Sequence, residues 1–373
     1  MMYARLPEPN DGAVARVSAA SAMGAEGDMR RLITWLSGGA VAVLLALVVP
    51  ASAGALPTAQ EVLAEMPVSD IDRERILNGE IVSWSASEGS DRELAFGMVL
   101  RVKATTAELV ELYHRAILFR VIPGVWGYGK LTSADGMEEL ARLRLKPDAE
   151  KEAARYFREE PGGELNLANE ERAAFRALRK SKGESITVED VEALIRQTLS
   201  ARYQAFRTRG LDGVAPYARG RRKSFDPAGD LRSATKQLTG IQRYLPGAVE
   251  RLLAYPSGGD LREQEESYYW MNIELFGRPT FALSHRMLFQ EGDGLVLADR
   301  QYYASHDYNV MQQVFSALPL DTGTLVVYIG RVSTDQVAGF GSRLKRKAAH
   351  LLAAPYYKDL FEEVRTRSEK LHR

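Results

Sequence analysis

The pattern of hydrophobic and polar positions divides the chain beyond residue 55 into three blocks, and the first block mixes helix and strand patterns. Thr58 is placed to cap a helix with apolar residues at helical spacing. Period-two alternation follows, and a Thr-Thr-Ala-Glu segment then has the pattern of a capping box. The elements expected in the block 56–133 are a helix over 56–78, strands over 80–86 and 93–103, and a helix from Thr105 to about Phe119.

The second block, 134–260, is highly charged and has helical periodicity. Glycines separate its segments, and no period of 20–50 residues indicates a solenoid. We expect helices over 135–143, 148–158, 168–181, 187–208, 227–243 and 246–254. The glycine-rich segment 124–129 just before this block contains Trp126 and is expected to form a tight loop at the mouth of a cavity.

The third block, 261–373, returns to period-two alternation and ends in an amphipathic helix. Short turns between its strands predict an antiparallel meander. The expected strands are 267–276, 280–290, 294–304, 307–318 and 323–332. The closing helix begins after the segment 339–342, and Pro355 marks a kink in it.

This order of elements resembles the helix-grip superfamily, which includes START lipid-transfer domains and Bet v 1-like proteins. The resemblance covers about 80–130 and 265–373, and block 134–260 departs from it as a helical insertion. It implies an α+β fold in which an antiparallel meander grips the long C-terminal helix. A hydrophobic ligand would then lie in a cavity between sheet and helix. The alternative is the same α+β arrangement packed without a cavity.

Composition and charge exclude several classes of function. The 373 residues include 49 basic and 49 acidic side chains, and a zero net charge argues against general nucleic-acid binding. Because the chain has no cysteine, disulfides, thiolate catalysis and iron–sulfur clusters are excluded. No metal-binding motif or phosphate-binding glycine loop is present in the sequence, so we expect no cofactor.

The first 55 residues have the pattern of an extension followed by an export signal. Residues 1–28 are expected to be a disordered extension or the product of a misassigned start. Residues 29–55 have the pattern of a signal peptide: two arginines, an uncharged run over 32–49, a proline, and small residues before cleavage near Ala53 or Ala55. The protein is therefore expected to be periplasmic or secreted, and an uncleaved membrane anchor is the alternative.

Candidate binding residues cluster on the predicted strands of the third block. His285 shares strand parity with four apolar residues, so its ring is expected to face the core or a cavity. The segment 299–309 is unusually polar and aromatic for a strand–turn–strand unit. The candidate ligand-binding residues are His285, Arg300, Tyr302, Tyr303, His306, Tyr308, Arg331 and Trp126. The alternative is a purely structural role, with a hydrogen-bonded sheet end and a buried, neutral imidazole.

The expected function is that of an exported protein that binds a hydrophobic or amphipathic, lipid-like small molecule. One alternative is a cyclase- or hydrolase-like enzyme that uses His285, His306 and Tyr303 in the same cavity. Another is a structural envelope protein that binds a second protein. A basic cluster at the start of the last helix is also expected to touch an anionic membrane surface. It consists of Arg343, Lys345, Arg346 and Lys347.

Overall fold

The computed structural model describes residues 56–158, 164–220, 223–257 and 264–371. The predicted extension and signal peptide, 1–28 and 29–55, lie outside the described residues. Among the residues that are described, no helix is both long and apolar enough to cross a membrane.

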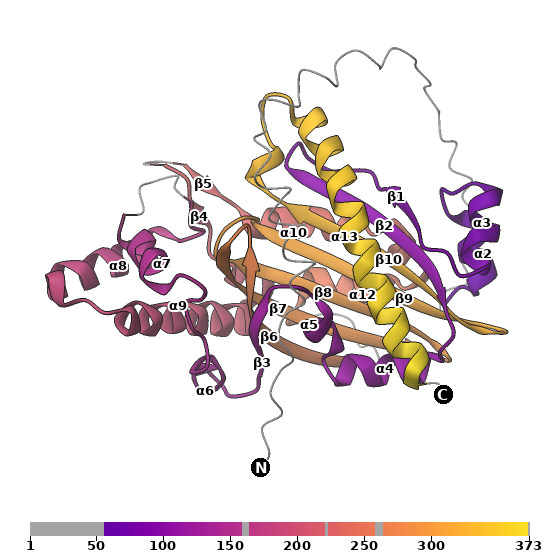
Figure 1. Cartoon of the computed structure of the whole chain (residues 1–373), viewed down its shortest axis with the longest axis horizontal. Helices are drawn as coiled ribbons and strands as arrows, with labels where there is room; N and C mark the ends of the chain where they lie inside the picture. The colour runs from indigo at the N-terminus through magenta and orange to yellow at the C-terminus, as the bar shows by residue number, and fades with distance from the viewer. Residues whose placement is uncertain (1–55, 159–163, 221–222, 258–263, 372–373) are drawn as a thin grey trace.

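A single eight-stranded antiparallel sheet organises the molecule (Figure 1). Its strands run in the order β1-β2-β10-β9-β8-β7-β6-β3. Their bounds are Val82–Ser85 (β1), Glu93–Val102 (β2), Val125–Leu131 (β3), Gln264–Leu275 (β6), Arg278–Glu291 (β7), Gly294–Ala304 (β8), Val310–Leu320 (β9) and Gly323–Ser333 (β10). The five-strand meander is confirmed, because β6 to β10 pair in sequence order. The predicted α+β class is confirmed as well.

Helices cover both faces of this sheet. On one face lie α4 (Thr106–His114), α5 (Ile117–Val121) and the long α13 (Ser342–Leu371), which crosses the front of the sheet in Figure 1. We call it the α13 face. The helices α2 (Ala59–Glu65), α3 (Asp70–Leu77), α9 (Val188–Arg209), α10 (Pro227–Lys236) and α12 (Pro246–Ala254) pack against the opposite side.

We call this opposite side the insertion face, because most of its cover comes from the helical block. The remaining helices of that block are α6 (Met137–Leu140), α7 (Ala149–Arg158), α8 (Asn169–Lys182) and α11 (Thr239–Tyr244), with a short hairpin of β4 (Tyr217–Ala218) and β5 (Ser224–Phe225). Figure 1 shows α7, α8 and the start of α9 extending beyond the sheet. The main hydrophobic core joins these helices to β7, β8 and β9.

Three local expectations need correction. The stretch 56–78 forms two helices, α2 and α3, each opened by a hydroxyl cap. The helix expected up to Phe119 is broken at Ala116, whose φ is 53°. The segment 124–129 belongs to strand β3, because it pairs with β6. Its glycines are required by a close approach: a Cβ on Gly129 would lie 2.5 Å from the indole nitrogen of Trp270.

Helix α13 continues through Pro355 without a break, and the kink expected there stays a prediction. Its two halves differ in surroundings. The C-terminal half packs on the sheet through residues such as Tyr357 and Phe361. The first turns of the helix lie beyond the ends of the strands (Figure 1).

Candidate ligand-binding cavity

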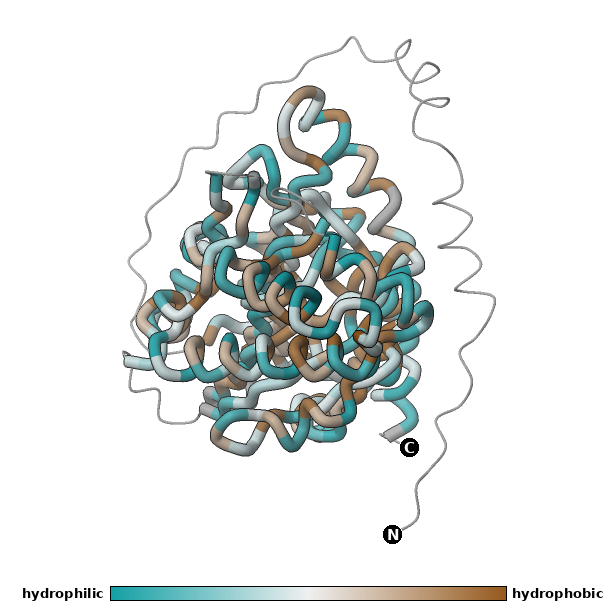
Figure 2. The backbone as a smooth tube through the Cα atoms, turned by 90° about the vertical axis from the view of Figure 1, so that its left-hand side faces the viewer, coloured by the Kyte–Doolittle hydropathy of each residue, from teal (hydrophilic) through white to brown (hydrophobic). Residues whose placement is uncertain are grey.

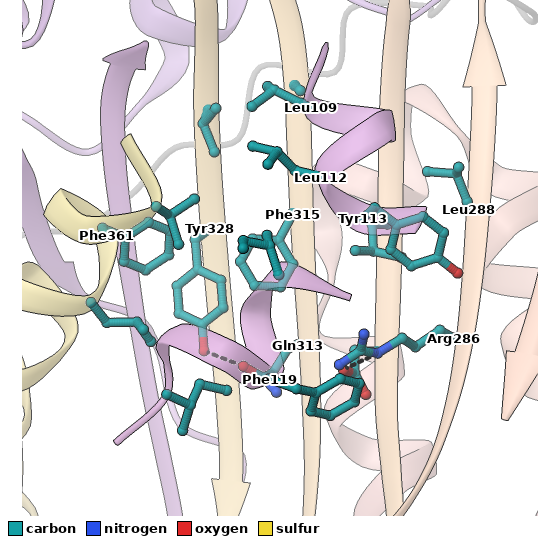
Figure 3. A pocket seen from close by; sticks show the side chains of 18 of the residues that line it. Leu109, Leu112, Tyr113, Phe119, Arg286, Leu288, Gln313, Phe315, Tyr328 and Phe361 are labelled. Carbon is teal, nitrogen blue, oxygen red and sulfur yellow. Dashed lines mark hydrogen bonds and ion pairs between the residues drawn. The ribbon is translucent and has the colours of Figure 1, made fainter. Parts of the chain in front are cut away.

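A cavity of about 140 Å³ lies between the α13 face of the sheet and the helices α4, α5 and α13. Figure 3 shows its side chains converging from both layers. Helix α13 contributes residues such as Phe361, and α4 contributes Leu109 and Leu112. The volume matches cavities that hold one small ring.

Small side chains on the central strands create this space. Ala282, Ser284 and Ala317 lie on the α13 face, where they leave room beneath the helices. The break in the chain at Ala116 sets α5 apart from α4, so no continuous helix fills the gap. Most of the remaining wall is apolar: Leu288, Leu295, Leu297, Phe315, Val326, Leu360 and Val364.

One side of the cavity carries a buried ion pair. Arg286 Nε donates to Asp299 Oδ2 at 2.8 Å, and both side chains are only 4% exposed. The Arg286 guanidinium also lies over the rings of Phe119, at 4.3 Å, and Tyr269, at 4.8 Å. The second carboxylate oxygen, Asp299 Oδ1, is buried and has no hydrogen-bond partner among the described residues. Such an atom is costly unless something else donates to it.

Neutral polar groups extend this polar side. The Tyr328 hydroxyl donates to Gln313 Oε1 at 2.8 Å, and Figure 3 marks this bond among the lining side chains. Gln301 also lines the cavity and accepts a hydrogen bond from the Tyr308 hydroxyl. Burial raises the pKa of Tyr113, a further lining residue, to about 12, so its phenol is neutral at physiological pH.

None of the eight residues predicted from the sequence belongs to the described lining of this cavity. His285 is buried, as strand parity predicted, but on the insertion face. Its ring stacks on Tyr268 with centroids 4.8 Å apart and also contacts Tyr255 and Phe206. Burial lowers the pKa of His285, and the nearby Glu266 carboxylate opposes this shift only in part. Glu266 Oε2 is 3.7 Å from His285 Nε2, which has no hydrogen-bond partner among the described residues.

Arg300 is also fully buried on the insertion face, where neutral groups satisfy it. It donates from Nη1 to the Leu252 carbonyl at 2.6 Å, from Nη2 to Thr235 at 2.8 Å, and from Nε to Gln312 at 3.0 Å. Leu252 and Thr235 lie in the last turns of α12 and α10. The negative ends of two helix dipoles therefore stabilise this guanidinium.

A bulge opposite Leu283 and Ser284 turns two consecutive tyrosines toward the insertion helices. Tyr302 stacks on Phe206 with a centroid distance of 3.9 Å, and the guanidinium of Arg202 lies 4.2 Å from the Tyr303 ring. Regular alternation along a strand would place these two residues on opposite faces.

The other predicted residues lie apart from one another. His306 Nδ1 is 2.6 Å from Asp307, and its Nε2 is 2.9 Å from the Pro279 carbonyl. Arg331 pairs with Glu93 at 3.1 Å on the insertion face. Tyr308 is buried in the β8–β9 connection.

Trp126 is 43% exposed on the edge strand β3, where its indole donates to Glu274. The partners of His285, His306 and Tyr303 are all different, so the structure does not bring these three together around one cavity. The eight residues therefore lie outside the cavity under α13, and their role in ligand binding stays a prediction.

Sequence reasoning missed the residues that do line the cavity. Arg286 and Asp299 stand one position from His285 and Arg300, so alternation assigns them to the other face. From the sequence alone that face is expected to meet solvent, because alternation does not show that α4, α5 and α13 cover it. The available signal was the directly opposed Arg–Asp pair on neighbouring strands.

Comparisons with known proteins give a weak likeness. No protein-family model and no curated protein matches the chain. A solved START superfamily protein from Mycobacterium smegmatis aligns with 18% identity over 28% of this chain and 66% of that protein, with a TM-score of 0.20. The chain thus covers just under two thirds of that protein. This match is a weak, partial likeness, and the START resemblance of the chain stays a prediction.

Proposed function

We propose that this protein binds an amphipathic small molecule in the cavity beneath α13. The observation that carries the proposal is the unpartnered Asp299 Oδ1 beside Arg286 in a mostly apolar cavity. An empty apolar cavity needs no ligand, but a buried carboxylate oxygen without a donor is costly.

The chemistry of the pair indicates which polar group the ligand carries. Asp299 Oδ1 requires a donor, and Arg286 makes one hydrogen bond to a described residue, from Nε, which leaves its other nitrogens to donate. A hydroxyl group can donate to Asp299 and accept from Arg286 at the same time. The ligand class that fits is therefore a compact apolar body with a hydroxyl at one end.

The experiment is to purify the protein from the cells that produce it, extract it with organic solvent, and identify bound molecules by mass spectrometry. We expect a hydroxylated apolar molecule. Removing both charges with Arg286→Met and Asp299→Leu together avoids an orphaned buried ion, so the fold is expected to survive. Ligand content is expected to fall about tenfold or more, because the ligand hydroxyl loses its hydrogen bonds to two charged groups.

The matched control is the buried pair on the insertion face, changed by Arg331→Met and Glu93→Leu. Its side chains are 5% and 8% exposed, and both Glu93 oxygens have partners. The control is expected to keep its ligand. Equal ligand loss in both double variants, or an extract without any small molecule, contradicts the proposal.

We further propose that the protein is exported after cleavage near Ala53 or Ala55. The support is the arginine pair, uncharged run and small-residue site over 29–55. Sequencing the N-terminus of periplasmic protein tests this proposal. Finding the intact segment 29–49 in the membrane fraction contradicts cleavage.

A further inference from the structure

The N-terminal half of α13 and the loop before it expose apolar side chains at a tip of the molecule. Phe340 is fully exposed, and it stands between Gly339 and Gly341, which have φ values of 76° and 74°. Leu344 is 42% exposed and Leu351 is 65% exposed. Figure 1 shows this tip beyond the strand ends, and Figure 2 shows hydrophobic stretches on it.

The exposed leucines form one stripe whose direction is fixed by the other side of the helix. Leu344, Ala348 and Leu351 are spaced i, i+4 and i+7, so they share a face. On the opposite side, Arg346 lies 2.5 Å from Glu88, and His350 lies 2.9 Å from the same carboxylate. These two contacts hold the helix to the body of the protein and leave the stripe pointing outward.

Cations border this stripe. Arg343, Lys345 and Lys347 are exposed, and none of them makes an ion pair with a described residue. Lys345 and Lys347 lie on either flank of the stripe, and the first turn of α13 has no acidic residue. Arg346, which the sequence grouped with them, is instead bound to Glu88 and to the Asp91 carbonyl. The tip thus carries three cations without an ion pair to a described residue, and Lys345 Nζ donates to the Ala338 carbonyl at 3.1 Å.

We propose that this tip, made of Phe340, Leu344, Leu351 and the cations Arg343, Lys345 and Lys347, docks on a bilayer that contains anionic phospholipids. An outward apolar stripe flanked by lysines is typical of helices that lie at a membrane interface. The lysine stems can follow the stripe into the interface while their amines reach lipid phosphates. The tip protrudes, so a bilayer can accept Phe340 without a complementary pocket, which a protein partner would need.

The test is sedimentation with vesicles of phosphatidylcholine alone and of phosphatidylcholine mixed with phosphatidylglycerol. We expect the full protein to bind the anionic vesicles more strongly and to be released by salt. Phe340→Ser is expected to lower binding to the anionic vesicles about tenfold, and Lys345→Glu with Lys347→Glu about as much. Each variant is compared with the wild type in the same preparation, so any contribution from residues 32–49 cancels.

Two exposed residues elsewhere provide matched controls. Ile71→Ser removes an apolar side chain that is 71% exposed on α3, and Lys180→Glu reverses an exposed charge on α8. Both controls are expected to bind like the wild type, and thermal melts should show that all variants are folded. Binding that is insensitive to Phe340→Ser, or equal on both vesicle types, overturns the proposal. Because the tip and the cavity share no residue, this outcome is independent of ligand binding.

Discussion

The two faces of the central sheet are built from the same strands but are filled differently. On the insertion face, β7 and β8 present His285, Met287 and Tyr302 to a layer of aromatic rings from α9 and from the end of α12. On the α13 face the same strands present Ser284 and Arg286 to a cavity. Side chains that alternate along one strand therefore pack into a core on one face and line a cavity on the other.

This difference separates structural polar groups from candidate binding groups. Arg300 on the insertion face donates three hydrogen bonds to protein groups, so its burial is explained by the fold itself. Asp299, the next residue back along the chain, keeps one buried oxygen without a donor at the edge of a cavity. A buried carboxylate points to a ligand when one of its oxygens lacks a donor and adjoins open space.

The largest expected contrast comes from removing one phenylalanine on each face. Phe206→Ala removes a ring enclosed by Tyr302, Tyr255 and His285, so the free energy of unfolding should fall by about 3–5 kcal/mol. Phe315→Ala removes a ring that borders the cavity and is only partly buried, so the loss should be about 1–2 kcal/mol. Chemical denaturation of both variants measures the difference. Equal losses would show that the two faces are equally well packed.

Adding volume should reverse the sign of the comparison. Ala298 and Ala317 are both buried alanines on the central strands, but Ala298 faces the insertion and Ala317 lines the cavity. Ala298→Leu should destabilise the protein by about 1–3 kcal/mol because no space is available. Ala317→Leu should leave stability within about 1 kcal/mol and displace any bound ligand. Denaturation and extraction of the two variants test this; a destabilising Ala317→Leu would indicate a filled cavity.

Much of the sheet could be predicted because period-two alternation and short turns are local signals. The strands β6 to β10 follow from them, and so does the long closing helix. Strand β3 could not be predicted, since its glycines are explained only by the Trp270 ring beneath them. The bulge that turns both Tyr302 and Tyr303 to one face is likewise a tertiary feature without a local sequence signal.

The site was harder to predict for a physical reason. Alternation shows that His285 and Arg286 point to opposite faces, but it does not show which layer of helices leaves space. The apolar residues on the same strand favoured His285, although its ring is surrounded by Phe206, Tyr255 and Tyr268. Arg286 and Asp299 were overlooked because charged residues on the alternate face of a strand usually meet solvent.

His285 provides a direct test of this reassignment. His285→Ala should lower the free energy of unfolding by about 1–3 kcal/mol, because the ring packs against Tyr268 and Tyr255. The amount of extractable ligand per folded protein should stay unchanged, because His285 does not line the cavity. Thermal melts and solvent extraction on this one variant measure both quantities. Ligand loss in a stably folded His285→Ala protein would show that the ligand binds on the insertion face.

The smallest expected effect is the dependence of stability on pH. Burial lowers the pKa of His285 below its ordinary value of 6.5, so the folded state holds a neutral ring while the unfolded chain becomes protonated below that pH. Between the two pKa values the unfolded state binds more protons, so the free energy of unfolding falls as the pH falls, by at most about 1.4 kcal/mol per pH unit.

The variant His285→Phe tests this dependence, because it keeps a ring in the aromatic layer and cannot titrate. The stability difference between wild type and this variant should therefore be constant above pH 6.5 and should shift in favour of the variant below it. His114→Gln is the matched control, because that imidazole is exposed and pairs with Glu265 at the surface. Melting curves between about pH 5 and 8 measure the effect. Parallel pH profiles for wild type and His285→Phe would contradict this prediction, because the folded protein would then protonate His285 as readily as the unfolded chain does.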